Sequence, residues 1–84
     1  MLTPEQSRAA RGWLDWKQSD LAQKANVGLS TVRDFEKGRR KPIENNMLAI
    51  VGAFEKAGIS FLYDEKDRAT GIIAGAAVQK DVEK

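Results

Sequence analysis

Residues 18–37 constrain the fold of this 84-residue chain more than any other stretch. Within them, apolar residues recur three and four positions apart in two short segments: Leu21, Ala22 and Ala25, then Val32 and Phe35. This spacing places each set on one face of a helix. Between the segments stands the Asn-Val-Gly sequence of residues 26–28, and Asn and Gly tolerate positive φ. We therefore predict two short helices joined by a sharp turn, the second exposing one face.

This pattern resembles the helix-turn-helix of the Cro/phage-repressor class, the Xre family. Ala22 stands at the small position of the first motif helix, Asn26 at the left-handed turn position, and residues 36–39 resemble a Glu-x-Gly-Arg/Lys ending. The resemblance covers roughly residues 3–58 and implies an all-α, four-helix, λ-repressor-like domain. Two positions depart from the pattern: Lys17 replaces the usual Ser or Thr cap, and Asn26 replaces the usual glycine.

Composition narrows the possible functions. The chain has no Cys and no His, which excludes disulfides, thiol nucleophiles and Cys/His metal sites. We expect no catalytic residues, no cofactor and no bound metal, and therefore no enzyme. No apolar run is long enough for a membrane span, and we expect a cytoplasmic protein. Residues 1–42 hold nine Lys/Arg and five Asp/Glu, whereas residues 43–84 hold five and seven. The basic half contains the helix pair, as contact with a polyanion requires.

Four helices are expected, near residues 4–14, 18–25, 29–37 and 44–57. Thr3 and Gln6 form a capping box at the first start. The family resemblance further implies that Arg11 forms an ion pair with Glu36, locking the first helix onto the third. The alternative is a solvated Arg11.

Two tryptophans lie where the first helix meets the motif. Trp13 and Trp16 stand near basic residues, and aromatic side chains in such places can stack on bases. Because both precede the presumed reading face, we expect them instead to pack against the helix pair.

The outward positions of the third helix are the candidate base contacts: Leu29, Ser30, Arg33 and Asp34. Arg33 can donate two hydrogen bonds to guanine, and Leu29 can meet a thymine methyl group. Packing is the alternative for Leu29. Asp34 can accept from cytosine, or it can orient Arg33 or Arg39.

A second set of residues is expected to contact phosphates: Lys17, Gln18, Thr31, Lys37, Arg39, Arg40, Lys41 and Asn46. Gln18 begins a helix, where backbone N–H groups favour an anion. Four of the eight follow the presumed reading helix within five residues, around Gly38, which ends that helix. A merely solvated charged surface is the alternative.

The remaining chain departs from the commonest family layout, which adds a fifth helix. We expect a helix-turn-helix domain over residues 1–58, a strand or hairpin segment over 59–78 and a disordered tail over 79–84. The strands are placed at 59–63 and 72–78, with a turn over 64–71. A hairpin alone is marginal in water, so residues 59–78 are also a candidate homodimer contact by strand addition. A frayed, partly helical tail is the alternative.

These features favour a sequence-specific transcriptional regulator, by default a repressor, that binds double-stranded DNA as a homodimer on an inverted repeat. One recognition helix contacts few base pairs, so two half-sites are needed. The alternative is an antitoxin or adaptor whose C-terminal segment binds a protein partner.

Overall fold

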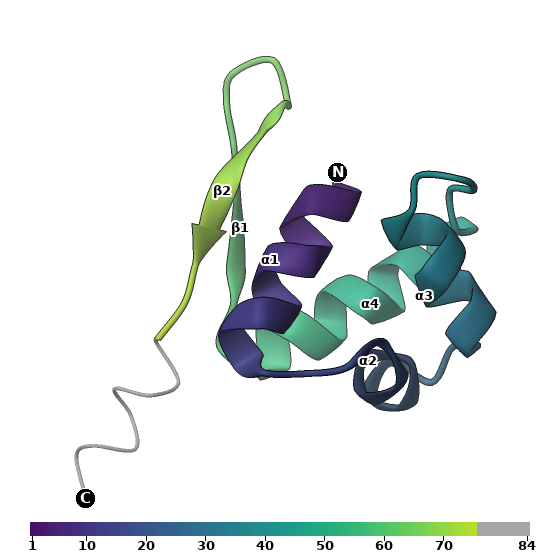
Figure 1. Ribbon diagram of the computed structural model, residues 1–84. Helices are drawn as coiled ribbons and strands as arrows, with labels where there is room; N and C mark the ends of the chain where they lie inside the picture. The colour runs from purple at the N-terminus through teal and green to yellow at the C-terminus, as the bar shows by residue number, and fades with distance from the viewer. Residues whose placement is uncertain (76–84) are drawn as a thin grey trace, which may run out of the picture.

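The structure is a computed structural model and describes residues 1–75. Four helices precede a two-stranded antiparallel hairpin: α1 (Pro4–Leu14), α2 (Gln18–Ala25), α3 (Leu29–Glu36), α4 (Glu44–Lys56), β1 (Ser60–Tyr63) and β2 (Ala69–Ile73). In Figure 1 the hairpin lies at one side of the molecule and α3 at the other, with α1 and α4 between them. The predicted four-helix domain with a short C-terminal hairpin is confirmed. Within residues 1–75, no helix combines the length and the apolar run that crossing a bilayer requires.

Local signals at the helix ends behave as the sequence predicts. The Thr3 side chain accepts from the Gln6 N–H, and the Gln6 side chain accepts from the Thr3 N–H, which completes the capping box. At α2 the unusual Lys17 provides no side-chain cap. Instead, the Asp20 carboxylate accepts from the Lys17 N–H at 2.9 Å. Asp20 therefore fixes the start of α2 as well as complementing its dipole.

The turn between α2 and α3 depends on asparagine rather than glycine. Asn26 adopts the left-handed conformation with φ 57°, and its N–H bonds back to carbonyls of α2. Gly28, in contrast, is extended with φ −69° and precedes α3 as its N-cap residue. Both residue types tolerate positive φ. Only Asn26 uses it, because one left-handed residue suffices to end α2.

The helices enclose a single apolar core. Its largest fully buried side chains are Phe54, Leu21, Ile50, Ile59 and Val32. Phe54 of α4 lies at the centre: Trp16 stacks on it and Phe61 of β1 meets it edge-on, each with ring centroids 5.7 Å apart. Trp16 therefore packs inward as expected, but chiefly on Phe54 of α4, with Lys24 of α2 over its ring. The expectation is wrong for Trp13, which is 63% exposed.

The second strand begins and ends earlier than predicted, because Ala74 and Gly75 of the expected 72–78 strand lie beyond its end at Ile73. Strand β2 starts at Ala69, so the last three residues of the expected 64–71 turn belong to the strand. The cause is the tight loop before it, where the Asp64 carboxylate accepts the N–H groups of Lys66 and Arg68. With this loop, Leu62 pairs with Gly71, and the register of the two strands shifts between Leu62 and Tyr63. Residues 76–78 of the expected strand and the expected disordered tail, residues 79–84, lie outside the described residues.

The inner face of the hairpin packs on the helices. Phe61 and Ile72 are partly buried against the core. The buried Gln6 of α1 donates from its amide to the carbonyls of Leu62 and Gly71, at 3.2 and 3.1 Å. One side chain thus joins α1 to both strands, so the hairpin does not stand alone in water.

Candidate nucleic-acid interface

Helix α3 presents one face to the core and another to solvent. Its buried residues are Val32, Phe35 and Glu36, three and four positions apart. Of the four candidate base contacts, Ser30 and Arg33 are exposed and Asp34 is half-buried. Leu29 is half-buried and packs against the core, so at least part of its side chain takes the packing role. The most accessible predicted reading positions are Ser30 and Arg33.

The basic segment after α3, residues 37–41, folds back onto that helix. Gly38 has φ 77°, a conformation that favours glycine, and reverses the chain. The Asp34 carbonyl then accepts the N–H groups of Arg39 and Arg40, at 2.8 and 3.3 Å. The backbone of the segment is therefore fixed, whereas the Arg39, Arg40 and Lys41 residues remain exposed.

A groove of about 230 Å³ lies between α3, the basic segment and the start of α4. Eight residues line it: Ser30, Thr31, Asp34, Arg40, Lys41, Pro42, Ile43 and Asn46. Six of these are predicted base or phosphate contacts, drawn from three parts of the chain. The remaining predicted contacts do not line the groove: Lys17, Gln18, Leu29, Arg33, Lys37 and Arg39. The tertiary fold thus assembles half of the predicted set at one place.

Among the described residues, no side chain neutralises the charge of the cations around this groove. Within residues 1–75, ion pairs join Arg11 to Glu36, Arg68 to Asp64 and the N-terminal amine to Asp67. None of these involves a cation of α3 or of the basic segment. The Asp34 carboxylate, a predicted partner of Arg33 or Arg39, forms an ion pair with neither. Such exposed, unpaired cations suit contact with phosphates.

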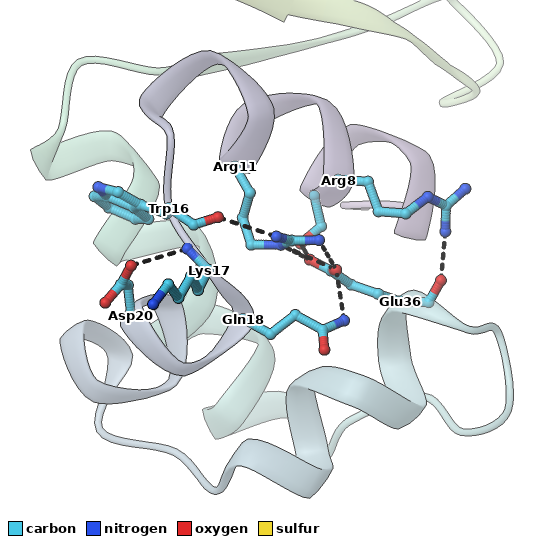
Figure 2. A network of polar contacts seen from close by, with 8 residues as sticks. Arg8, Arg11, Trp16, Lys17, Gln18, Asp20 and Glu36 are labelled. Atoms are coloured by element: carbon cyan, nitrogen blue, oxygen red, sulfur yellow. Dashed lines mark hydrogen bonds and ion pairs between the residues drawn. The ribbon is translucent and has the colours of Figure 1, made fainter.

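A buried polar cluster holds α3 in position (Figure 2). The Glu36 carboxylate accepts from Arg11 Nη2 at 2.7 Å, from Gln18 Nε2 at 3.1 Å and from the Ser7 hydroxyl. Arg11 also donates to the Trp16 carbonyl at 3.0 Å. Ser7 and Arg11 belong to α1, and Gln18 begins α2. Four side chains therefore join three helices, and the Gln18 amide points at Glu36.

The ionised state of Glu36 is favoured despite its burial. Burial alone would raise the pKa of this carboxyl group, but the hydrogen bonds from Arg11, Ser7 and Gln18, together with the Arg11 charge, outweigh it. The pKa of Glu36 is consequently lower than its ordinary value. The Arg11–Glu36 ion pair can stabilise the fold at this depth only because Ser7 and Gln18 also donate hydrogen bonds to the carboxylate.

Sequence reasoning missed two members of this region. Ser7 is fully buried with its hydroxyl on Glu36, and the exposed Arg8 donates to the Glu36 backbone carbonyl. Ser7 precedes Arg11 by four residues, so both lie on one face of α1. That spacing was the available signal for Ser7. Nothing in the local sequence points to Arg8, because its acceptor is a backbone group 28 residues away.

Comparison with known proteins gives a consistent result. No curated protein sequence matches the chain. The profile of the family described as Helix-turn-helix matches residues 8–60, which include α2, α3, α4 and most of α1. The matched region contains the groove beside α3 and every member of the Glu36 cluster except Ser7. The chain belongs to the Xre/Cro-type helix-turn-helix family of DNA-binding domains.

Proposed function

We propose that this protein is a sequence-specific regulator of transcription that binds an inverted-repeat operator as a homodimer in the cytoplasm. We take repression as the default mechanism, because a protein bound to a promoter blocks the transcription machinery from that promoter. The observation that carries the proposal is the groove between α3 and α4, where Ser30 and Thr31 lie beside Arg40 and Lys41. Hydroxyl groups next to unpaired cations suit a phosphate backbone alongside base edges.

In this proposal α3 enters the major groove and α2 lies across the backbone. Arg33 reads a base, with Ser30 beside it. Lys17, at the start of α2, and the basic segment contact phosphates on either side. Gln18 has a supporting part as well, because its amide holds Glu36 and thereby orients α3.

The first experiment is selection of bound sites from a random duplex library, followed by titration on the selected site. We expect two half-sites related by inversion, because one α3 covers too few base pairs for useful specificity. If the protein shows no duplex binding even at low salt, the proposal is wrong.

A charge-removal pair tests the phosphate contacts. Arg39→Gln with Arg40→Gln should weaken binding to all duplexes and lower the salt slope by about 2, since each lost phosphate contact lowers it by about 0.9. Lys56→Gln with Lys66→Gln removes equal charge from α4 and the hairpin loop, and should leave the slope nearly unchanged. If both double variants lower the salt slope equally, the slope depends on the net charge of the protein and not on contacts made by Arg39 and Arg40.

Arg33 has its own test. Arg33→Ala should cost about 1–3 kcal/mol on the selected site and relax preference at one base position. Arg33→Lys keeps the charge but loses the planar fork, so it should relax preference equally. If Arg33→Lys keeps the preference at that base position, Arg33 contacts a phosphate rather than a base.

A further inference from the structure

Two residues of the basic segment, Arg40 and Lys41, line a second groove as well as the one beside α3. This second groove, which we call the N-terminal groove, has a volume of about 430 Å³ and lies between residues 1–4, the end of α3 and the first turn of α4. Leu2, Phe35 and Met47 form its base, and none of them is more than 5% exposed. Its volume falls within the roughly 300–1,000 Å³ of small-molecule sites.

Local structure fixes the walls of the N-terminal groove. The capping box of α1 holds Thr3, and thereby the neighbouring Leu2, in place. On the other side, Gly38 reverses the chain, and the Asp34 carbonyl fixes the backbone N–H of Arg40. A Cβ added at Gly38 would meet no atom within 4 Å, so the groove is open beside this residue. The site is therefore formed before any ligand arrives, as most ligand sites are.

Charge and apolar surface are divided within the N-terminal groove. Arg40 and Lys41 are exposed and form no ion pair within residues 1–75. Asp67, the acidic residue that lines the groove, instead forms an ion pair with the Met1 amine at 3.4 Å. The base is apolar, and the thioether of Met47 can adapt to the shape of a ligand. These properties complement a molecule that has an apolar chain and one anionic group.

We propose that the N-terminal groove binds a small amphipathic carboxylate. Its chain packs on the apolar base, and its carboxylate accepts charge-assisted hydrogen bonds from Arg40 and Lys41. Because both cations also line the groove beside α3, a bound carboxylate competes there with a DNA phosphate. This antagonism between ligand and DNA rests on the proposed operator-binding function, whereas the binding of the carboxylate does not.

The first test measures binding of decanoate in the absence of DNA, with 1-decanol and acetate as matched probes. Decanoate should bind saturably at one site, about tenfold or more tighter than either of the others, since each of these lacks half of the interaction. In NMR spectra decanoate should shift the amide signals of Phe35, Gly38 and Met47. The amides of Leu62 and Ile73, two exposed apolar residues of the hairpin, should not shift.

A pair of variants tests the two cations. Arg40→Gln with Lys41→Gln should weaken decanoate binding about tenfold or more. Lys37→Gln with Arg39→Gln removes equal charge from the same segment, but neither residue lines the groove, so decanoate affinity should change by less than about twofold. All four residues are exposed, and thermal unfolding should confirm that both variants fold like the wild type.

The last test joins the N-terminal groove to DNA. Saturating decanoate should weaken wild-type binding to a half-site selected from the random library by about fivefold or more, and the duplex should weaken decanoate binding by the same factor. Decanoate should have no such effect on Arg40→Gln with Lys41→Gln, because this variant lacks the shared cations.

The inference is overturned if decanoate does not saturate a site, if 1-decanol or acetate binds as tightly, or if the hairpin amides shift instead. Equal losses in the two double variants would also overturn it, since net charge would then explain them. Decanoate binding that leaves DNA affinity unchanged would refute the antagonism. If decanoate binds as expected but no duplex is bound, the ligand site stands and the operator-binding function fails.

Discussion

The two flanks of α1 are held by different chemistry. Towards α3, Arg11 and Ser7 meet the Glu36 carboxylate, whose side chain is only 1% exposed. Towards the hairpin, the neutral Gln6 amide bonds to backbone carbonyls, and Phe61 and Ile72 add apolar contact. One flank therefore depends on a buried charge and the other on a neutral amide with apolar packing.

The difference matches what each side presents to solvent. The α3 side exposes cations that form no ion pair within residues 1–75, and the buried Glu36 fixes that helix from within. The hairpin side is held without a charged pair, and it exposes Leu62 and Ile73 to solvent. The cations of the α3 side suit contact with a polyanion, whereas the two strands of the hairpin carry no charged residue.

The largest expected effect separates the two flanks directly. Arg11→Ala leaves Glu36 buried without its ionic partner, which should lower the free energy of unfolding by about 3 kcal/mol. Urea denaturation measures the change. Arg33→Ala removes the same side-chain type from an exposed position and should stay within about 0.5 kcal/mol. Similar losses in both variants would show that the charged cluster contributes little.

A smaller effect is expected on the hairpin flank. Gln6→Ala removes three neutral hydrogen bonds, the capping-box bond and the two amide bonds to the strands, which at about 0.5–1 kcal/mol each should cost about 2 kcal/mol. Native-state hydrogen exchange should show the greatest loss of protection in the amides of β1 and β2. Gln23→Ala, at an exposed site of α2, is the matched control. Uniform loss across α4 and the hairpin would contradict a separate attachment of this flank.

The smallest effect concerns acid. The pKa of Glu36 is lowered in the folded protein, so its ionised form stabilises the fold fully above its ordinary value of 4.5. That stabilisation is lost as the pH falls through the lower, folded pKa. The stability advantage of wild type over Glu36→Gln should therefore shrink below pH 4.5.

Asp64 provides the comparison on the hairpin side. Backbone N–H groups of Arg68 and Lys66 and the Arg68 side chain lower the pKa of its carboxyl group, but 26% of the Asp64 side chain is exposed, against 1% for Glu36. Asp64→Asn should therefore change the acid dependence less than Glu36→Gln does. Carbon-detected NMR titration reads each group directly. A Glu36 midpoint at or above 4.5 would rule out the stabilising role.

Much of the helical part could be predicted because its signals are local. The Thr3–Gln6 capping box, the left-handed Asn26 and the apolar spacing of α2 and α3 each depend on residues within about one turn. Local rules therefore set the helix bounds to within one residue. The strand β2 was harder, since its start depends on the Asp64 loop and on pairing with β1.

The sequence predicted which kinds of residue form the candidate site, but it did not predict how all of them are arranged. Residue types and their order along the chain pointed to Arg33 and to the basic segment. The sequence could not show that Leu29 partly packs inward or that Trp13 is exposed. Those outcomes depend on how α1 and α3 lie against their neighbours.

By itself, then, the sequence determined the helices, their turn and the location of positive charge, because spacing and caps act over a few residues. Only the tertiary structure decided how the two flanks of α1 are held. Gln6 meets carbonyls 56 and 65 residues away, and Ser7 meets a carboxylate 29 residues away. These partners come close together only when the chain has folded. Once buried, the Gln6 amide and the Ser7 hydroxyl cannot bond to water, so each must bond to a protein acceptor that tertiary packing places beside it.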